Sequence, residues 1–312
     1  MDKQGILKQL KEVTEIKRLK FPERINLTSE NGILCVEMTE GGLLANMQEN
    51  QSAFEAWIIA IKATCPELVH KAVIRWSHPE KANLHYVRFL YRVIKFEESY
   101  DWVSIAPIDS NAKGYLENIR RELSQWVINY PDSDAKIDAE KTEAQLERAL
   151  LNNLKSDLGT ESGNQLPIGL FFKKKSGKKE YERTPRRNSQ LDLWSIRNNT
   201  FTVYELKKEE NTPLGIISEL MFYVNVIKDI SLGTIRYPND AVEGKDFRNF
   251  GVVFDKLPHN KKMKIEGVFL ANTLHSLFHY KQAEILEILN DNHRGISYEH
   301  AGFDSITKRI IN

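Results

Sequence analysis

Cysteine is almost absent from this sequence of 312 residues, which contains only Cys35 and Cys65. Two isolated cysteines provide neither a disulfide framework nor a cysteine-rich zinc site, so a reduced, cytoplasmic setting is the simplest expectation. No apolar run approaches the length needed to cross a bilayer, and the N-terminal segment lacks the short apolar core of a signal peptide. We therefore expect a globular cytoplasmic protein without membrane association.

Excess charge of either sign is also lacking, because the formal net charge is +1. Overall composition therefore does not indicate a nucleic-acid partner, and only the distribution of charge is informative. The segment 173–187 contains eight Lys or Arg and two Glu, a local net charge of 8 − 2 = +6. The sequence contains no Gly-rich phosphate loop, no dinucleotide fingerprint and no Ser or Cys nucleophile motif.

The apolar pattern predicts a mixed α/β (α+β) fold, and the length is sufficient for two domains. In the first part the spacing predicts helices at 3–20, 48–64 and 111–130, and strands at 32–38, 71–76 and within 85–106, the last ones antiparallel. The polar segment 130–141 is the expected boundary between a domain of residues 1–133 and a domain of residues 134–312.

The second part has a clear order of elements. We predict helices at 139–156, from Pro213 onward and at 274–289, and strands at 165–172, 191–196, 201–208, 264–271 and 296–303, with Asn198 and Asn199 as a turn. The core order is therefore helix–strand–strand–strand–helix–strand.

Charged side chains interrupt two apolar strands of this order. Asp192 lies before the Asn198–Asn199 turn, and Glu205 and Lys207 lie after it. Because side chains alternate along a strand, Glu205 and Lys207 share a face, and a hairpin brings Asp192 beside Glu205. Two carboxylates and a main-chain carbonyl can hold Mg²⁺, which activates water and polarises phosphate, while a lysine stabilises developing negative charge. A solvated hairpin with mixed charges is the alternative for this pattern.

Residues 140–271 resemble the PD-(D/E)xK nuclease-like, or restriction-endonuclease-like, superfamily. The resemblance rests on Asp192, on the Glu205-Leu206-Lys207 tripeptide and on the order of elements around them. The resemblance implies a central sheet flanked by helices and phosphodiester cleavage with Mg²⁺ or Mn²⁺. It also implies that Asp192 and Glu205 bind the metal and that Lys207 is the catalytic lysine. Leu191 replaces the proline of the first motif, at a position that varies widely across the superfamily.

Members of this superfamily often have a further acid on the helix before the sheet, where this sequence has Glu143 and Glu147. The segment ERALLNNL is similar to the start of archaeal Holliday-junction resolvases, which favours Glu147 as a third catalytic and metal-binding residue, with Glu143 as an accessory candidate. Two exposed helix glutamates are the alternative.

RecBCD-type nuclease domains often have a Gln-x-x-x-Tyr pair on the helix after the lysine. The corresponding residues here are Glu219 and Tyr223, so the tyrosine fits and the glutamine does not. Both are accessory candidates, and a core position is the alternative that we prefer for Tyr223.

The basic segment 173–187 becomes informative through this resemblance, because it lies just before Asp192. Its side chains can contact a phosphate backbone without reading base sequence, and a solvated hairpin is the alternative. The eight candidate nucleic-acid-binding residues are Lys173, Lys174, Lys175, Lys178, Lys179, Arg183, Arg186 and Arg187.

We therefore expect a Mg²⁺- or Mn²⁺-dependent deoxyribonuclease that acts in restriction, repair or phage defence. Residues 1–133 would select substrate, bind a protein partner or dimerise, and a homodimer is consistent with double-strand cutting. One alternative is a module on a nuclease-like fold that binds nucleic acid or a partner without cleavage. Another is a structural or assembly protein without nucleic-acid affinity. RNA is a further substrate class, since no motif separates it from DNA.

Overall fold

The computed structural model describes residues 1–128, 142–158, 161–174, 178–185, 189–208, 212–237 and 249–311. The chain divides into two compact units. Unit 1 consists of Met1–Arg121, Asn211–Glu219 and Thr273–Arg294, and unit 2 consists of Glu122–Glu210, Leu220–Asn272 and Gly295–Asn312. The predicted division into 1–133 and 134–312 is continuous, whereas these units are not. The segment expected to form the boundary, 130–141, lies outside the described residues.

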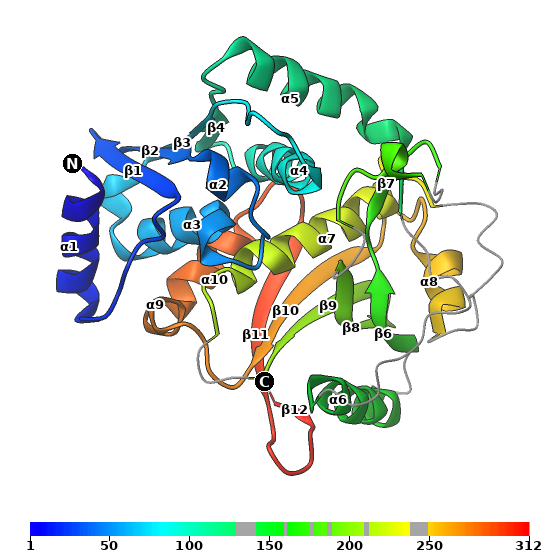
Figure 1. The fold of residues 1–312 in the computed structure, drawn as a ribbon. Coiled ribbons are helices and arrows are strands. Elements are labelled where there is room, and N and C mark those ends of the chain that lie inside the picture. Colours follow the sequence, from blue (N-terminus) through cyan, green and yellow to red (C-terminus); the bar gives the residue numbers. More distant parts are fainter. Residues whose placement is uncertain are drawn as a thin grey trace. The chain divides into compact units, whose positions relative to one another are not determined.

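Unit 1 contains a four-stranded sheet in the order β1-β2-β3-β4, in which β1 and β2 are antiparallel and β2, β3 and β4 are parallel (Figure 1). Helices α3 and α4 are the crossovers that parallel strands require. The elements are α1 (Lys3–Thr14), β1 (Ile25–Glu30), β2 (Ile33–Met38), α2 (Glu40–Leu43), α3 (Phe54–Thr64), β3 (Lys71–Trp76), α4 (Leu84–Ser99), β4 (Val103–Ile105), α5 (Ser110–Glu122), α9 (Ser276–Tyr280) and α10 (Gln282–Asn290), with 3₁₀ turns at Asn50–Ser52 and Pro66–Leu68.

The prediction of antiparallel strands within 85–106 is wrong for its first part, which forms helix α4, whereas its last part forms a strand, β4, that is parallel to β3. The run is rich in aromatic and β-branched residues, which favours a strand. The charged residues Arg88, Arg92 and Lys95 nevertheless recur at spacings of four and three, which is the period of a helix, and all three are buried. The side chain of Asn83 accepts hydrogen bonds from the next helical amides and caps the N-terminus. Helical charge spacing was therefore the better signal.

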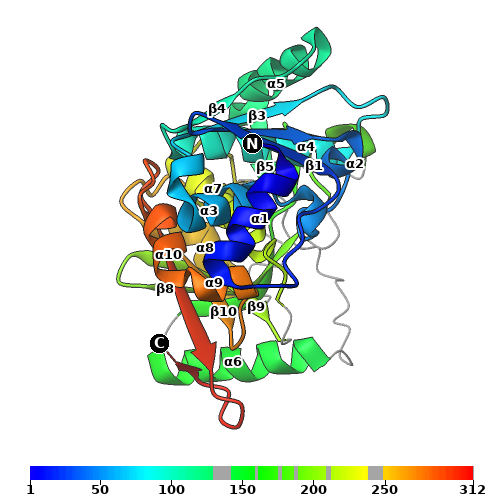
Figure 2. The same ribbon diagram turned by 90° about the vertical axis from the view of Figure 1, so that its left-hand side faces the viewer.

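Several predicted boundaries in unit 1 also differ from the structure. Helix α1 ends at Thr14, six residues earlier than predicted, where Glu15 adopts a left-handed conformation. Helix α3 begins at Phe54, after a 3₁₀ turn. The predicted helix 274–289 is broken at Lys281 into α9 and α10. Helix α10 lies beside α3 within the same unit (Figures 1 and 2).

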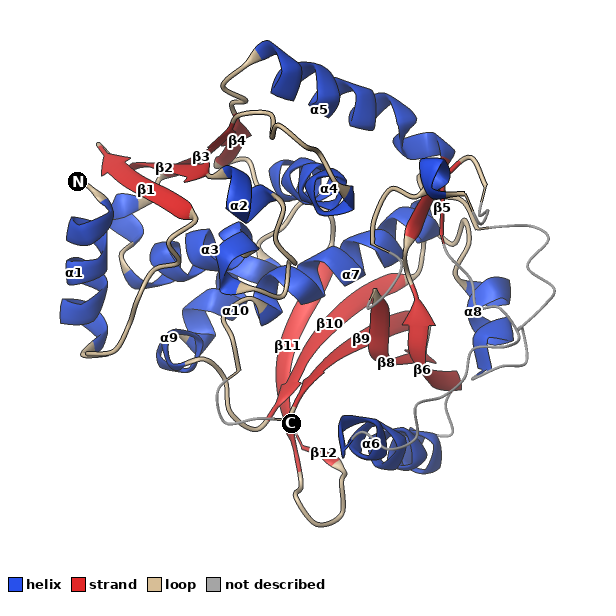
Figure 3. Cartoon of the chain, in the orientation of Figure 1, coloured by secondary structure: helices blue, strands red, loops and turns tan. Residues whose placement is uncertain are grey.

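Unit 2 contains a six-stranded sheet in the order β12-β11-β10-β9-β8-β6 and a two-stranded sheet of β5 and β7 (Figure 3). The predicted helix, three strands, helix and strand are present in that order, but the strand 165–172 is divided into β6 and β7, an additional helix α8 lies between α7 and β10, and the end of helix 111–130 forms β5. The elements are β5 (Trp126–Ile128), α6 (Thr142–Leu158), β6 (Glu161–Pro167), β7 (Leu170–Phe172), β8 (Gln190–Arg197), β9 (Thr200–Lys207), α7 (Ile216–Leu232), α8 (Phe250–Lys256), β10 (Lys264–Ala271), β11 (Ile296–Phe303) and β12 (Ile310–Ile311), with 3₁₀ turns at Leu123–Gln125 and Lys179–Tyr181.

Strands β8 and β9 form a hairpin whose register is set by its two-residue turn. Asn198 and Asn199 both have positive φ values, 48° and 60°, which match the turn type preferred between antiparallel strands. Arg197 therefore pairs with Thr200, and the pairing continues to Leu193 and Tyr204. The turn was predicted from the Asn-Asn pair, and its geometry determines which side chains of the two strands lie opposite each other.

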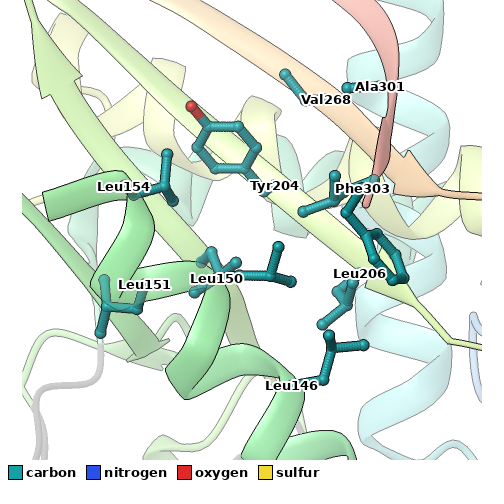
Figure 4. Packing of buried hydrophobic residues seen from close by; sticks show 11 residues of the cluster. Leu146, Leu150, Leu151, Leu154, Tyr204, Leu206, Val268, Ala301 and Phe303 are labelled. Carbon is teal, nitrogen blue, oxygen red and sulfur yellow. The ribbon is translucent and has the colours of Figure 1, made fainter. Parts of the chain in front are cut away.

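Helices cover both faces of the six-stranded sheet. On one face, α6 packs its leucines against the apolar residues of β8, β9, β10 and β11 (Figure 4). This cluster consists of Leu146, Leu150, Leu151, Leu154, Leu193, Tyr204, Leu206, Val268, Leu270, Ala301 and Phe303. On the other face, α7 approaches closely at Gly267, where an added Cβ would lie 3.0 Å from Val224 and 3.1 Å from Leu220. The sheet is therefore fixed between two helices.

Among the residues that the structure describes, no helix is both long enough and apolar enough to cross a membrane. The longest described helices, α6 and α7, have 17 residues each.

A buried ion pair in unit 1 provides a test of the packing between α3 and α4. Arg92 donates from Nε to Glu55 at 2.8 Å and also contacts it through Nη2, and the two side chains are 2% and 3% exposed. We expect Arg92→Met to lower the free energy of unfolding by about 3–5 kcal/mol, because it leaves a buried carboxylate without its cation. Urea denaturation followed by tryptophan fluorescence measures this loss.

The matched control is Arg120→Ala, which breaks a surface pair with Glu97 and should cost less than about 1 kcal/mol. The double variant Arg92→Met/Glu55→Met should recover most of the stability, since it removes both charges. A loss for Arg92→Met as small as that for Arg120→Ala would show that the pair is not buried in solution.

The acid stability of unit 1 should depend on His85. Burial and the neighbouring Arg88 lower the pKa of His85 from 6.5 to about 4, and Arg88 donates to its Nδ1 at 2.9 Å. The unfolded chain therefore binds a proton at higher pH than the folded chain, and stability falls as pH decreases from 6.5 toward 4. His85→Gln keeps an acceptor but does not titrate, so we expect a smaller loss over this range in urea denaturation. Parallel losses in both proteins would contradict this assignment.

Candidate active site of unit 2

Glu205 and Lys207 lie on one face of β9, as the alternation of side chains predicted. The Glu205 carboxylate is almost completely buried, and the ammonium of Lys207, which is 22% exposed, forms an ion pair with its Oε1. A buried carboxylate is stable only when a cation or hydrogen-bond donors compensate its charge. Lys207 therefore compensates the charge of the Glu205 carboxylate, as a bound cation would.

Asp192 lies where β8 and β9 separate. The backbone pairing of the two strands stops at Leu193 and Tyr204, although β8 begins at Gln190 and β9 continues to Lys207. Continuing this register places Asp192 opposite Glu205, since 193 + 204 = 192 + 205. The amide of Leu206 donates to Oδ2 of Asp192 at 2.9 Å. The side chain of Asp192 thus replaces a backbone acceptor and lies beside the Glu205-Leu206-Lys207 tripeptide.

Glu147 is on α6 and is 5% exposed. Its Oε2 accepts hydrogen bonds from Nε2 of Gln165 at 3.0 Å and from Nδ2 of Asn164 at 3.4 Å, both on β6. The alternative of an exposed helix glutamate is therefore wrong for Glu147. Glu143 lies in the first turn of α6, and its side chain lies outside the described residues.

The donor set at the strand ends fits a hard divalent cation better than a soft one. Asp192 and Glu205 supply carboxylate oxygens, and Leu206 between the two motif residues supplies a carbonyl, which are ligands that Mg²⁺ accepts together with water. The described residues contain no group of three His, Cys, Asp or Glu side chains placed to hold one metal ion. Glu147, Asp192 and Glu205 thus do not form such a group among the described residues, and metal binding by Glu147 stays a prediction.

The two accessory candidates on α7 are both buried. Glu219 is 1% exposed, belongs to unit 1 and accepts a hydrogen bond from Gln48. Tyr223 belongs to unit 2, is 1% exposed and packs against Phe222 with 5.8 Å between ring centroids. The core position that we preferred for Tyr223 agrees with this burial.

Four lysines of the basic segment are described, and their side chains are exposed. Lys173 and Lys174 place their ammonium groups 4.9 Å and 5.7 Å from the rings of Phe172 and Tyr181. Lys178 and Lys179 complete the set, whereas Lys175, Arg186 and Arg187 lie outside the described residues. The segment thus presents positive charge at the surface next to two aromatic rings.

Arg183 has a different environment from the lysines. Its Nη2 donates to Glu122 at 3.1 Å, its Nη1 donates to the carbonyl of Glu180 at 3.0 Å, and its guanidinium lies 4.6 Å from the ring of Phe172. These contacts tie the segment to the rest of unit 2. Arg183 is therefore held by contacts within unit 2, whereas the four described lysines are exposed.

Asn164 and Gln165 were not predicted as site residues. Gln165 is the first residue of the predicted strand 165–172, and Asn164 directly precedes that strand. Two adjacent polar amides at the start of an apolar strand are the signal that could have identified them.

The hydrogen bond from the Leu206 amide to Asp192 gives Asp192 a structural role that can be measured apart from any chemical role. Asp192→Ala removes the acceptor of a partly buried amide, which we expect to lower the free energy of unfolding by about 1–2 kcal/mol. Asp192→Asn keeps an acceptor oxygen and should cost less than about 0.5 kcal/mol. Urea denaturation of the full chain measures both, and equal losses in the two variants would show that the acceptor is not what stabilises this position.

Comparisons with protein-family models, with curated proteins and with solved structures found no match to this chain.

Proposed function

We propose that the chain is a metal-dependent nuclease that hydrolyses DNA phosphodiester bonds through a restriction-endonuclease-like core in unit 2. The observation that supports this function best is the position of Asp192, Glu205 and Lys207 at the separating ends of β8 and β9. Two carboxylates and one lysine on a small surface are the groups that phosphodiester hydrolysis with a divalent cation requires.

The arrangement of unit 2 supports the same proposal. Strand β9 lies between β8, which is antiparallel to it, and β10, which is parallel to it. Helix α6 covers one face of this sheet and α7 covers the other. A central sheet flanked by helices is what the resemblance to the PD-(D/E)xK superfamily implied, and Asp192 and Glu205 lie on the adjacent strands β8 and β9 of this sheet.

Each residue has a distinct task in this proposal. Asp192 and Glu205 would hold Mg²⁺ or Mn²⁺, which supplies an acidified water and polarises the phosphate. Lys207 is close enough to Glu205 to form an ion pair, so its ammonium is within reach of negative charge that develops at the same place. The four described lysines of the basic segment would contact the phosphate backbone of DNA.

A second function, binding of DNA without cleavage, is favoured by one specific observation. The Glu205 carboxylate is buried and already compensated by Lys207. A site whose charges are satisfied internally can be retained for folding alone. The two functions differ in whether divalent cations change the covalent structure of DNA.

A cleavage assay distinguishes these functions. Purified full-length protein is incubated with supercoiled plasmid, linear duplex and single-stranded DNA, with Mg²⁺, Mn²⁺ or EDTA. We expect cation-dependent cutting that EDTA abolishes and that Lys207→Ala lowers at least about 100-fold. Nicking of the circular plasmid would indicate an endonuclease, and degradation restricted to linear DNA would indicate an exonuclease.

Two further variants make this assay specific. Lys256→Ala is the matched control, because it removes a lysine that pairs with Glu161 at the surface and should leave cutting unchanged. Asp192→Asn should abolish cutting while keeping the acceptor for Leu206. DNA binding without cutting under every condition would favour the binding function. If the protein neither binds nor cuts DNA, both functions are excluded for the isolated chain.

A further inference from the structure

The loop between β11 and β12, residues 304–309, presents an isoleucine to solvent, and we call it the isoleucine loop. Ile306 is 87% exposed, and the next most exposed large apolar side chain of the described residues is Met1 at 54%. Figures 1 and 2 show that the loop extends beyond the end of β11. Single exposed apolar residues are common on proteins, so exposure alone does not indicate a function. The hydrogen bonds and charges around Ile306 make it informative.

Hydrogen bonds fix the backbone of the isoleucine loop from within and from α6. Oδ1 of Asp304 accepts from the amides of Ile306 and Thr307 at 2.9 Å and 2.5 Å and from the Thr307 hydroxyl at 2.9 Å. Nδ2 of Asn153, on α6, donates to the carbonyls of Thr307 and Lys308 at 2.7 Å and 2.8 Å. The fold therefore holds Ile306 at an exposed position, although burial of this side chain would be favourable.

The surface of α6 beside the loop is cationic. The exposed residues of α6 whose side chains are described are Gln145, Arg148, Asn152, Lys155 and Ser156. The first four recur at spacings of three and four, so they follow one face of the helix. This face has two cations and no described acid, and the loop adds Lys308 and the exposed Arg309 next to Ile306. Cations and amides along one surface are complementary to a phosphate backbone.

The isoleucine loop leaves the sheet at the edge where β9 ends. Strands β9, β10 and β11 are parallel, so their carboxyl ends share one edge. Lys207 pairs with Ala271, and the pairing of Leu270 with Ala301 continues to Ala271 and Gly302. The loop begins two residues after Gly302. Two strand spacings, about 10 Å, therefore separate its base from the end of β9. This span corresponds to about three base pairs of duplex DNA.

We propose that Ile306 is a wedge that inserts between neighbouring base pairs of duplex DNA, while Arg148 and Lys155 contact the phosphate backbone. This inference rests on the proposed nuclease function, which makes DNA the substrate. An apolar wedge unstacks a base step and kinks the duplex, so the protein must supply the free energy of unstacking. That free energy is smaller where the stack is already interrupted. The favoured substrate class is therefore duplex DNA with a bulge or a mismatch.

The experiment compares the affinity of the full chain for an uninterrupted duplex and for the same duplex with a single-base bulge. Fluorescence anisotropy is measured with EDTA and again with Ca²⁺ in place of Mg²⁺. We expect wild type to bind the bulged duplex about tenfold more tightly, and Ile306→Ala to bind both equally. Ile306→Leu keeps an apolar wedge and should retain the preference. The matched control is Ile108→Ala, which removes an isoleucine of unit 1 that is 45% exposed.

The cations of α6 should act on both duplexes alike, because phosphate contacts carry no information about stacking. We expect Arg148→Gln/Lys155→Gln to weaken binding of both duplexes by the same factor and to reduce the slope of log affinity against log salt by about two. The bulge preference should remain. Lys256→Ala, at the surface ion pair with Glu161, is the control for loss of a cation. The melting temperature of each variant should equal that of wild type, since the changed side chains are exposed.

The outcomes separate the wedge from the proposed function. Equal affinity of wild type for the two duplexes, or a preference that Ile306→Ala retains, would overturn the wedge and leave the nuclease proposal to the cleavage assay. If Ile306→Ala keeps the preference but changes the oligomeric state in analytical ultracentrifugation, Ile306 contacts a second copy of the chain and the wedge is overturned. Wild-type protein that binds neither duplex with EDTA or Ca²⁺ would overturn the wedge together with the DNA substrate.

Discussion

The turn at Asn198 and Asn199 determines the candidate site more than any other local feature of unit 2. A two-residue turn with both residues at positive φ permits one register between its strands. That register places Asp192 six residues before Asn198 and Glu205 six residues after Asn199, and therefore opposite each other. A slip of one residue would move Glu205 and Lys207 to the face that α6 covers, where their charges would lie in an apolar cluster.

Compensation of buried charge is the second constraint on this region. Glu147 and Glu205 are both almost completely buried, and each has specific partners. Glu205 pairs with the ammonium of Lys207, whereas Glu147 accepts from two neutral amides. The two amide donors of Glu147 lie on the neighbouring strand β6, whereas the ammonium that pairs with Glu205 lies two residues along the same strand, β9. The two glutamates are therefore not equivalent, although the sequence analysis assigned both of them to metal binding.

The sequence predicted unit 2 better than unit 1, for identifiable physical reasons. In unit 2 the strands β8, β9, β10 and β11 are bounded by clear turn residues, and their order and the Asn-Asn turn were predicted correctly. In unit 1 the segment of α4 is rich in aromatic and β-branched residues, which favours a strand, and this composition was given more weight than the helical spacing of its charged residues. The parallel pairing of β3 and β4 was missed as a consequence, since it requires α4 as a crossover.

The candidate site also contains some residues that could be predicted from the sequence and others that could not. Asp192, Glu205 and Lys207 could be selected from sequence because alternation and one short turn relate them. The hydrogen bonds of Asn164 and Gln165 to Glu147 could not, because Gln165 adopts a left-handed conformation for which glutamine has no preference. The role of Arg183 also required the structure, since its ion pair joins residues that are 61 positions apart.

The discontinuous course of the chain has a consequence for how the protein is made. Unit 1 includes residues 273–294, which form α9 and α10 beside α3. A ribosome synthesises the chain from its N-terminus, so unit 1 lacks these two helices until most of unit 2 has been translated. The apolar surface of α3 that α10 covers is exposed on the nascent chain during that interval. Unit 1 therefore cannot be completed as an early folding intermediate, and its final assembly belongs to the last stage of synthesis.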